Sequence, residues 1–336
     1  MNKSAIFSPV FASDSLLIAV WEVPGMESLF CYNFEDGSCD FTSYQHIVNA
    51  RFPGISRFGT MSFSGNIAGN RPGRGLFTSK LDGSDSILRC WINEKTDEGF
   101  DQAIFSPDGN RILFGRDNGK KDGIYVLDLD EKVPRKLLRN GGAPCWSPDG
   151  QLVACSVQKW KGQYGEIIII VPLDGRPARL VCKGCIPQWS PDGRHLCFTV
   201  RGFNEDTRLA RIGMVDVNGA NLHWLTPEES DALFPRWSRK GDYLYFSMNG
   251  NICRLKLSAM TIEPVVVSEG PRLWVEDISP NGQWLAYSAE DFPSLEQTQY
   301  IINIPSGKTL DISAILQIYD PRVAGTGPVR LNADEP

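Results

Sequence analysis

The sequence of 336 residues has few histidines and no long apolar run. Only His46, His195 and His223 occur, so the side chains that most often act as general bases or metal ligands are scarce. No stretch approaches the ~18 apolar residues that a membrane-spanning helix needs. Residues 1–20 are interrupted by Ser, Pro and Asp and therefore lack the apolar core of a signal peptide. We expect no membrane insertion and a cytoplasmic chain, or a periplasmic one if a leader has been removed.

An excess of positive charge is also missing. The formal net charge is −6 and the isoelectric point is about 5.3, so the chain as a whole does not attract phosphate backbones, which disfavours nucleic acid as a partner. Nine cysteines are an odd number, and they are scattered through apolar segments rather than clustered as in a small disulfide-rich domain. We expect buried free thiols in a reducing compartment.

What the sequence does contain is a repeat. Seven times, a short apolar stretch runs into a turn that begins with Ser and is followed by another strand-like segment. Pro presets φ for the first corner, Asp can accept hydrogen bonds from nearby amides, Gly takes the positive φ of the return, and the Ser hydroxyl caps the turn. We assign these residues a structural role. The three clearest copies are Ser106, Pro107, Asp108, Gly109; Ser147, Pro148, Asp149, Gly150; and Ser190, Pro191, Asp192, Gly193.

The spacing of the repeat predicts the architecture. The seven turn serines, at positions 8, 56, 106, 147, 190, 238 and 279, lie 41 to 50 residues apart, and each unit has room for four short strands. This pattern indicates an all-β fold, a single closed β-propeller of seven four-stranded blades. Six blades is the alternative if the first unit only completes the last blade. We predict a propeller over residues 1–323 and a flexible tail over 324–336, with closure by packing or by pairing of residues 315–323 with an end blade.

The motif Trp-Ser-Pro-Asp-Gly followed by an apolar strand resembles the TolB-like, or PD40, family of WD40-like β-propellers. In that family the motif marks the turn between the first two strands of a blade, so the resemblance implies a fold and no catalytic residue. TolB-type periplasmic proteins also carry a signal peptide and an N-terminal α/β domain, whereas about seven residues precede the first turn here. In related peptidases a hydrolase domain follows the propeller, but this sequence has no Gly-x-Ser-x-Gly elbow.

Residues with metal-binding or redox chemistry are sparse. Cys182 and Cys185 form one C-x-x-C pair without a second pair at zinc-site spacing, and the segment joins two strand-like stretches, so we predict a turn between blades. His195 is predicted to be an exposed strand residue. Pairs such as Asp82-Gly83 fit hairpin turns better than calcium sites. We predict no catalytic residue, no metal and no cofactor.

The least repetitive segments carry the functional prediction. The connections between second and third strands, near residues 66–75, 116–123, 158–165 and 201–211, combine basic and aromatic side chains, which supply many interface anchors. The segments between blades on the same rim are acidic, and a face of mixed sign suits a protein better than a polyanion. The predicted binding residues are Arg71, Arg74, Arg116, Lys121, Trp160, Tyr164, Arg201 and Phe203.

Two functions follow as hypotheses. The first is a non-catalytic propeller that binds a protein or peptide partner through this loop face. The alternative is a propeller enzyme, or a protein that binds a small saccharide, with a site at the axial mouth lined by carboxylates or His together with Arg. The fold by itself cannot decide between them, because one scaffold hosts unrelated functions.

Overall fold

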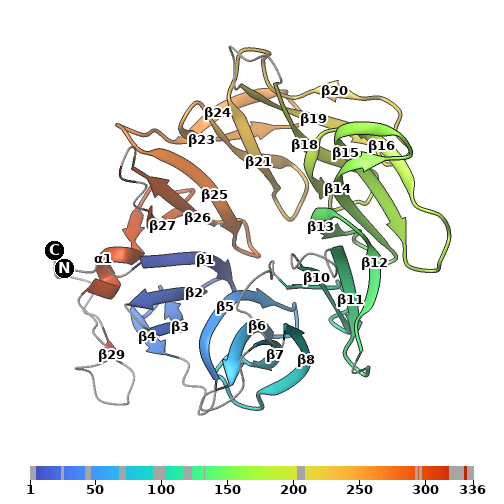
Figure 1. Cartoon of the computed structure of the whole chain (residues 1–336). Helices are drawn as coiled ribbons and strands as arrows, with labels where there is room; N and C mark the ends of the chain where they lie inside the picture. Colours follow the sequence, from blue (N-terminus) through green and yellow to red (C-terminus); the bar gives the residue numbers. More distant parts are fainter. Residues whose placement is uncertain are drawn as a thin grey trace. The chain divides into compact units, whose positions relative to one another are not determined.

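The computed structural model describes residues 5–23, 26–41, 47–67, 73–93, 103–116, 123–131, 133–202, 209–291, 294, 297–317 and 329–330. These residues form seven sheets, each built on four strands that follow one another in the sequence, and a short fifth strand from the C-terminal tail joins the first sheet (Figure 1). The predicted all-β fold, a β-propeller of seven four-stranded blades, is confirmed, and the six-bladed alternative is wrong. None of the helices in the described residues has the length and apolar character to cross a membrane.

The chain divides into two compact units, residues 1–105 with 276–336 and residues 106–275. The described elements of unit one are β1 (Ala5–Phe11), β2 (Leu16–Val23), β3 (Met26–Asn33), β4 (Ser38–Phe41), β5 (Ile47–Ile55), β6 (Thr60–Ile67), β7 (Arg74–Lys80), β8 (Ile87–Asn93), β9 (Ile104–Phe105), β26 (Trp284–Glu290), β27 (Gln297–Asn303), β28 (Thr309–Asp311), α1 (Ile312–Gln317) and β29 (Val329–Arg330).

Unit two holds the remaining strands. They are β10 (Arg111–Arg116), β11 (Gly123–Asp128), β12 (Arg135–Leu138), β13 (Gly141–Trp146), β14 (Leu152–Trp160), β15 (Gln163–Pro172), β16 (Arg179–Lys183), β17 (Cys185–Trp189), β18 (His195–Arg201), β19 (Ala210–Asp216), β20 (His223–Trp224), β21 (Ala232–Trp237), β22 (Tyr243–Met248), β23 (Asn251–Lys256), β24 (Thr261–Val266) and the start of β25 (Arg272–Ile278).

In unit one, the first and last sheets pack against each other without sharing a strand. Phe11, Leu17 and Phe30 of the first sheet form one buried cluster with Ala286 and Ile301 of the last. The backbone N–H of Phe11 also donates to Asp277 Oδ2 (2.8 Å), and that of Asn281 donates to Asp14 Oδ1 (2.7 Å). Packing therefore joins the two ends of the repeat, as one of the two predicted modes of closure proposes.

The tail adds one short pairing. The two-residue strand β29 lies antiparallel to β4, with Val329 opposite Cys39 and Arg330 opposite Ser38. Residues 315–323 are predicted to pair with an end blade, but residues 318–323 of this segment lie outside the described residues. The boundary at residue 323 and the flexible tail stay predictions.

The Ser-Pro-Asp-Gly turns of unit two share one hydrogen-bond pattern. Ser147 Oγ donates to Asp149 Oδ1 (2.5 Å) and accepts the N–H of Leu152 (2.9 Å), and the copies at Ser106 and Ser190 repeat both contacts. The serine hydroxyl lowers the pKa of the aspartate in all three turns below its ordinary value, because the hydrogen bond favours the carboxylate. The motif closes hairpins, as the sequence predicts.

A tryptophan precedes three turns of unit two, at Trp146, Trp189 and Trp237, and these rings pack between neighbouring sheets. Trp189 is buried in one cluster with Ala154 and Ile168 of the preceding sheet, and Trp237 Nε1 donates to the carbonyl of Gln188 (3.3 Å). The guanidinium of Arg111 lies 5.3 Å from the ring centroid of Trp146. Large rings thus join adjacent blades within unit two.

Because consecutive strands are antiparallel, each sheet has two different ends. We call the end with the first-to-second-strand turns and the third-to-fourth-strand turns the turn end. The other end carries the second-to-third-strand connections and the connectors to the next sheet, and we call it the loop end. In unit two, the loop end includes the β14–β15, β18–β19 and β22–β23 connections and the segments between β20 and β21 and between β24 and β25.

Candidate functional site

The β14–β15 connection is shorter than predicted. The expected loop over residues 158–165 is wrong in extent, because β14 continues to Trp160 and β15 begins at Gln163. Lys161 and Gly162, at φ 44° and 89°, turn the chain in two residues, as tight hairpins do. Tyr164 is 71 % exposed beside this turn, and Lys159 Nζ lies 4.5 Å from its ring centroid. Trp160 is half-buried, with Lys161 Nζ 5.6 Å from its ring.

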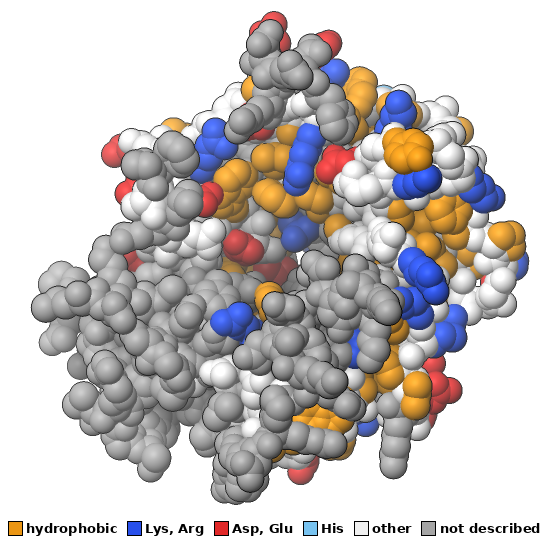
Figure 2. All heavy atoms as spheres, in the orientation of Figure 1, with side chains coloured by type: hydrophobic (Ala, Val, Ile, Leu, Met, Phe, Trp, Pro, Cys, Tyr) orange, Lys and Arg blue, Asp and Glu red, His pale blue; other side chains and the backbone are white. Residues whose placement is uncertain are grey.

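Arg201 ends β18 at the loop end and is exposed. Its Nη1 atom lies 3.7 Å from Glu166 Oε1 on β15, an ion pair that spans two neighbouring sheets. In the part of Figure 2 that corresponds to unit two in Figure 1, blue Lys and Arg side chains lie among orange apolar ones.

The remaining predicted binding residues are placed differently. Arg74 begins β7 and is only 3 % exposed; its Nη1 atom donates to Ser64 Oγ (3.1 Å) and to the carbonyl of Asn49 (3.3 Å). Arg116 ends β10, with its guanidinium 5.1 Å from the ring centroid of Tyr125. Arg71, Lys121 and Phe203 lie outside the described residues. The eight residues stay a prediction as a binding set.

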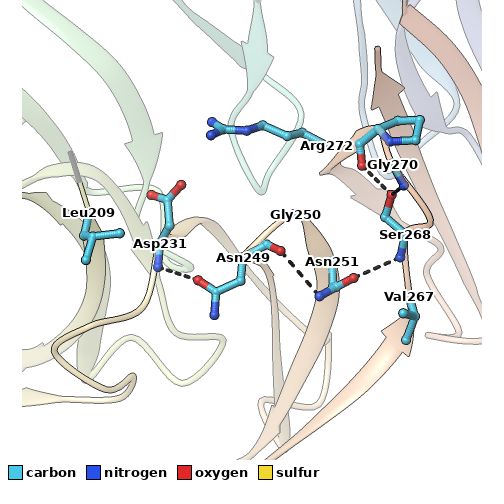
Figure 3. Close-up of a pocket in the computed structure, with 10 residues that line it drawn as sticks. Leu209, Asp231, Asn249, Gly250, Asn251, Val267, Ser268, Gly270 and Arg272 are labelled. Carbon is cyan, nitrogen blue, oxygen red and sulfur yellow. Dashed lines mark hydrogen bonds between the residues drawn. The ribbon is translucent and has the colours of Figure 1, made fainter. Parts of the chain in front are cut away.

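A pocket of about 560 Å³ opens at the loop end of unit two (Figure 3). It forms where four connections meet: the end of β18–β19, the segment between β20 and β21, the β22–β23 turn, and the connector from β24 to β25. Its lining residues are Leu209, Asp231, Asn249, Gly250, Asn251, Val267, Ser268, Gly270, Pro271 and Arg272. Its volume falls within the range of small-ligand sites.

The β22–β23 turn holds the pocket wall together. Asn249 and Gly250 both have positive φ, 52° and 83°, as a two-residue type I′ hairpin requires. Asn249 Oδ1 accepts the N–H of Asp231 (2.9 Å), and the N–H of Asn249 donates back to the carbonyl of Asp231 (3.0 Å). On the other side, Asn251 Oδ1 accepts the N–H of Ser268 (2.9 Å), and the carbonyl of Gly250 accepts the N–H of Leu273 (3.0 Å). One hairpin thus braces both connectors.

Sequence reasoning found this end of the sheets and missed most of this pocket. Asp231 lies in one of the acidic segments between blades, whereas Arg272 and the two asparagines carry no prediction. The sequence signal that could have located the pocket wall is the dipeptide Asn249-Gly250 between two apolar runs, because Asn-Gly predicts a two-residue hairpin turn. Nothing in the sequence signals that Asp231 and Arg272 line one cavity.

A second cavity, of about 300 Å³, lies at the turn end of unit two and involves His195. His195 is half-buried rather than fully exposed, and its Nε2 atom lies 3.4 Å from Asp216 Oδ1. Its Nδ1 atom lies 3.9 Å from Asp192 Oδ1. Among the residues that the structure describes, no three His, Cys, Asp or Glu side chains are arranged to hold a metal ion.

The C-x-x-C segment joins two sheets, as predicted. Cys182 lies on β16 and Cys185 on β17, with Gly184 between the strands at φ 141°. Burial raises the pKa of both thiols to about 12, and at Cys185 the carboxylate of Glu166 adds to the rise. Both thiols are therefore protonated at neutral pH and are poor nucleophiles. None of the nine cysteines forms a disulfide bond in the described part of the chain, and seven of them are buried.

Solved structures similar to this chain are propellers from proteins of several kinds. The propeller domain of the Trilobed protease from Pyrococcus furiosus, described as having an open velcro topology, matches with a TM-score of 0.67 and 14% identity over 92% of this chain and 98% of that one. Oligogalacturonate lyase from Vibrio parahaemolyticus matches with a TM-score of 0.66 and 12% identity over 91% and 92%. A putative TolB from Agrobacterium tumefaciens matches with a TM-score of 0.53 and 20% identity over 72% of this chain and 89% of that one. At these identities the likeness concerns the fold.

Family membership rests on the sequence. A search among curated proteins returns no match. The family model PD40, described as the TolB beta propeller domain, matches residues 104–314, which is more than half of the chain. The match includes the Ser-Pro-Asp-Gly turns and the pocket at the loop end of unit two. The chain therefore belongs to the TolB β-propeller domain family.

Proposed function

We propose that this chain is a non-catalytic interaction platform that binds a peptide segment of a partner protein at the loop end of unit two. The observation that supports this proposal is the pocket beside β22–β23, which combines a firmly bonded wall with charged and apolar side chains. Peptide-binding sites commonly join a few placed polar groups to apolar anchors. Tyr164 and Arg201, at the loop end of the sheets that contain β15 and β18, offer further contacts of the kinds enriched in interfaces.

Exposed side chains that have no packing role are suited to carry the test. Val267 lines the pocket and is 67 % exposed. Val133, in the turn between β11 and β12 at the turn end, is 75 % exposed and serves as a matched control. A carboxylate at either position reaches solvent, so neither Val267→Glu nor Val133→Glu should unfold the chain.

The experiment selects ligands first and then compares the variants. The wild-type chain is used to select binders from a phage-displayed library of random 12-residue peptides, and the affinity of the selected peptides is measured by fluorescence anisotropy. We expect Val267→Glu to weaken binding about tenfold or more, the effect of losing roughly 1.4 kcal/mol at an interface, and Val133→Glu to weaken it less than about twofold. Equal effects of the two substitutions would contradict a site at the loop end.

A further inference from the structure

The pocket wall at the loop end is held by hydrogen bonds among its own residues. Asn249 and Asn251 use their side-chain oxygens to accept backbone N–H groups, and Asn251 Nδ2 donates to the carbonyl of Asn249 (3.5 Å). Ser268 Oγ accepts the N–H of Gly270 (3.1 Å) and donates to the carbonyl of Pro271. Figure 3 shows this chain of bonds running along the base of the pocket. The wall is thus a support in which the side-chain oxygens of Asn249, Asn251 and Ser268 are already hydrogen-bonded.

Two charged side chains that line the pocket, Asp231 and Arg272, have no bonding partner among the residues that the structure describes, unlike the oxygens of the wall. Figure 3 shows the carboxylate of Asp231 turned into the pocket and the side chain of Arg272 extending from β25 toward the side on which Asp231 lies. Across the described part of the chain, neither the carboxylate of Asp231 nor the guanidinium of Arg272 makes a hydrogen bond or an ion pair. One pocket therefore presents an open negative group and an open positive group.

This pairing selects among ligand classes by charge. A ligand with one charge would pair with one side chain and meet a like charge on the other, which costs binding free energy. A ligand with both charges would pair twice, because a guanidinium binds a carboxylate in two parallel hydrogen bonds and a carboxylate accepts from an ammonium or guanidinium. A neutral saccharide would find the side-chain oxygens of Asn249 and Asn251 already accepting backbone N–H groups, and it would leave both charges unpaired. Leu209 and Val267 add apolar contact at the rim.

We propose that this pocket recognises a peptide segment of a partner protein that carries one basic and one acidic side chain, with Asp231 binding the basic group and Arg272 the acidic one. This inference rests on the proposed peptide-binding function and specifies its ligand. The volume of about 560 Å³ accommodates a stretch of a few residues. Specificity comes from the two open charges, while the braced hairpin keeps them in place.

A double-mutant cycle on the full chain tests the proposal. The probe is a 12-residue peptide selected by the wild-type chain, together with two derivatives in which its basic or its acidic residue is replaced by Gln. We expect Arg272→Gln to lower the affinity for the parent peptide at least tenfold. It should have little further effect on the affinity for the derivative without the acidic residue. Asp231→Asn should behave in the same way toward the derivative without the basic residue.

Arg239→Gln is the matched control, because Arg239 is an exposed arginine in a turn at the turn end. It should leave the affinity for every peptide unchanged. If the wild-type chain binds peptides but Asp231→Asn and Arg272→Gln show no coupling to the peptide charges, the inference is overturned and the peptide-binding function stands. If the wild-type chain retains no peptide from the library, both the function and the inference are overturned.

Discussion

The two ends of the sheets in unit two are built on different rules. At the turn end, three copies of the same motif form the same serine-to-aspartate hydrogen bond, at 2.5, 2.5 and 2.6 Å. At the loop end, the β14–β15 connection turns at Lys161-Gly162 and the β22–β23 connection at Asn249-Gly250, and each has different neighbours. Repetition therefore marks the end that closes hairpins, and variation marks the end that is free to acquire a binding site.

The difference has a physical origin. A first-to-second-strand turn must return the chain within four residues between two core strands, so few residue types fit it. A second-to-third-strand connection at the loop end can be short or long without disturbing the core, since surface connections tolerate changes in length. Stability should depend on the turn end and ligand binding on the loop end, and each prediction below tests that separation.

The largest effect on stability is expected from Ser147→Ala. The buried hydroxyl of Ser147 donates to Asp149 and accepts the N–H of Leu152, and its loss leaves that N–H without its partner. We expect the free energy of unfolding to fall by about 2 kcal/mol, measured by urea denaturation, with peptide affinity unchanged. Ser268→Ala at the loop end should do the reverse, weakening peptide binding more than stability. Weaker peptide binding by a folded Ser147→Ala variant would contradict the separation.

A pair of glycines gives a matched comparison of intermediate size. Gly150 at the turn end has φ 67° and Gly250 at the loop end has φ 83°, and a Cβ atom at Gly250 would meet no atom within 4 Å. Alanine at Gly250 should lower the free energy of unfolding by about 1 kcal/mol, because L residues are disfavoured at positive φ. Alanine at Gly150 should lower it somewhat more, because the new Cβ would also lie 3.3 Å from Arg111 Nη2. Only Gly250→Ala should also weaken peptide binding, since its turn braces both connectors. Equal peptide affinities for the two variants would show that the hairpin does not position the site.

Most of the fold follows from the sequence, because the turn motif and its spacing determine local hairpins. The three clearest turns, predicted at Ser106, Ser147 and Ser190, all close the hairpin between the first two strands of a sheet. The site follows less well, since it depends on contacts between distant segments. Arg74 reads as a loop cation, and its burial against Ser64 and Asn49 becomes evident only once β5, β6 and β7 pair. Asp231 and Arg272 lie on separate connectors, so only the folded chain places them in one pocket.

The smallest expected effect comes from Asp149→Asn, and it depends on pH. The seventh copy of the turn already carries an asparagine: Ser279 Oγ donates to Asn281 Oδ1 (2.8 Å), so the turn accommodates the amide. At neutral pH we expect a loss of only about 0.5 kcal/mol, because a charge-assisted bond becomes a neutral one.

At acid pH, the free energies of unfolding of the wild-type chain and of Asp149→Asn should fall with different slopes. The pKa of Asp149 is lowered in the folded state, mainly by the Ser147 hydroxyl, from an ordinary value of 3.8. Its contribution to stability is therefore complete above about pH 4 and is lost as pH falls through the lower, folded-state pKa. Urea denaturation between pH 6 and pH 2 should show a shallower acid loss for Asp149→Asn than for the wild-type chain. Parallel curves below pH 4 would mean that the serine-to-aspartate bond does not stabilise the charged form, and that the turn end is held by backbone geometry and packing.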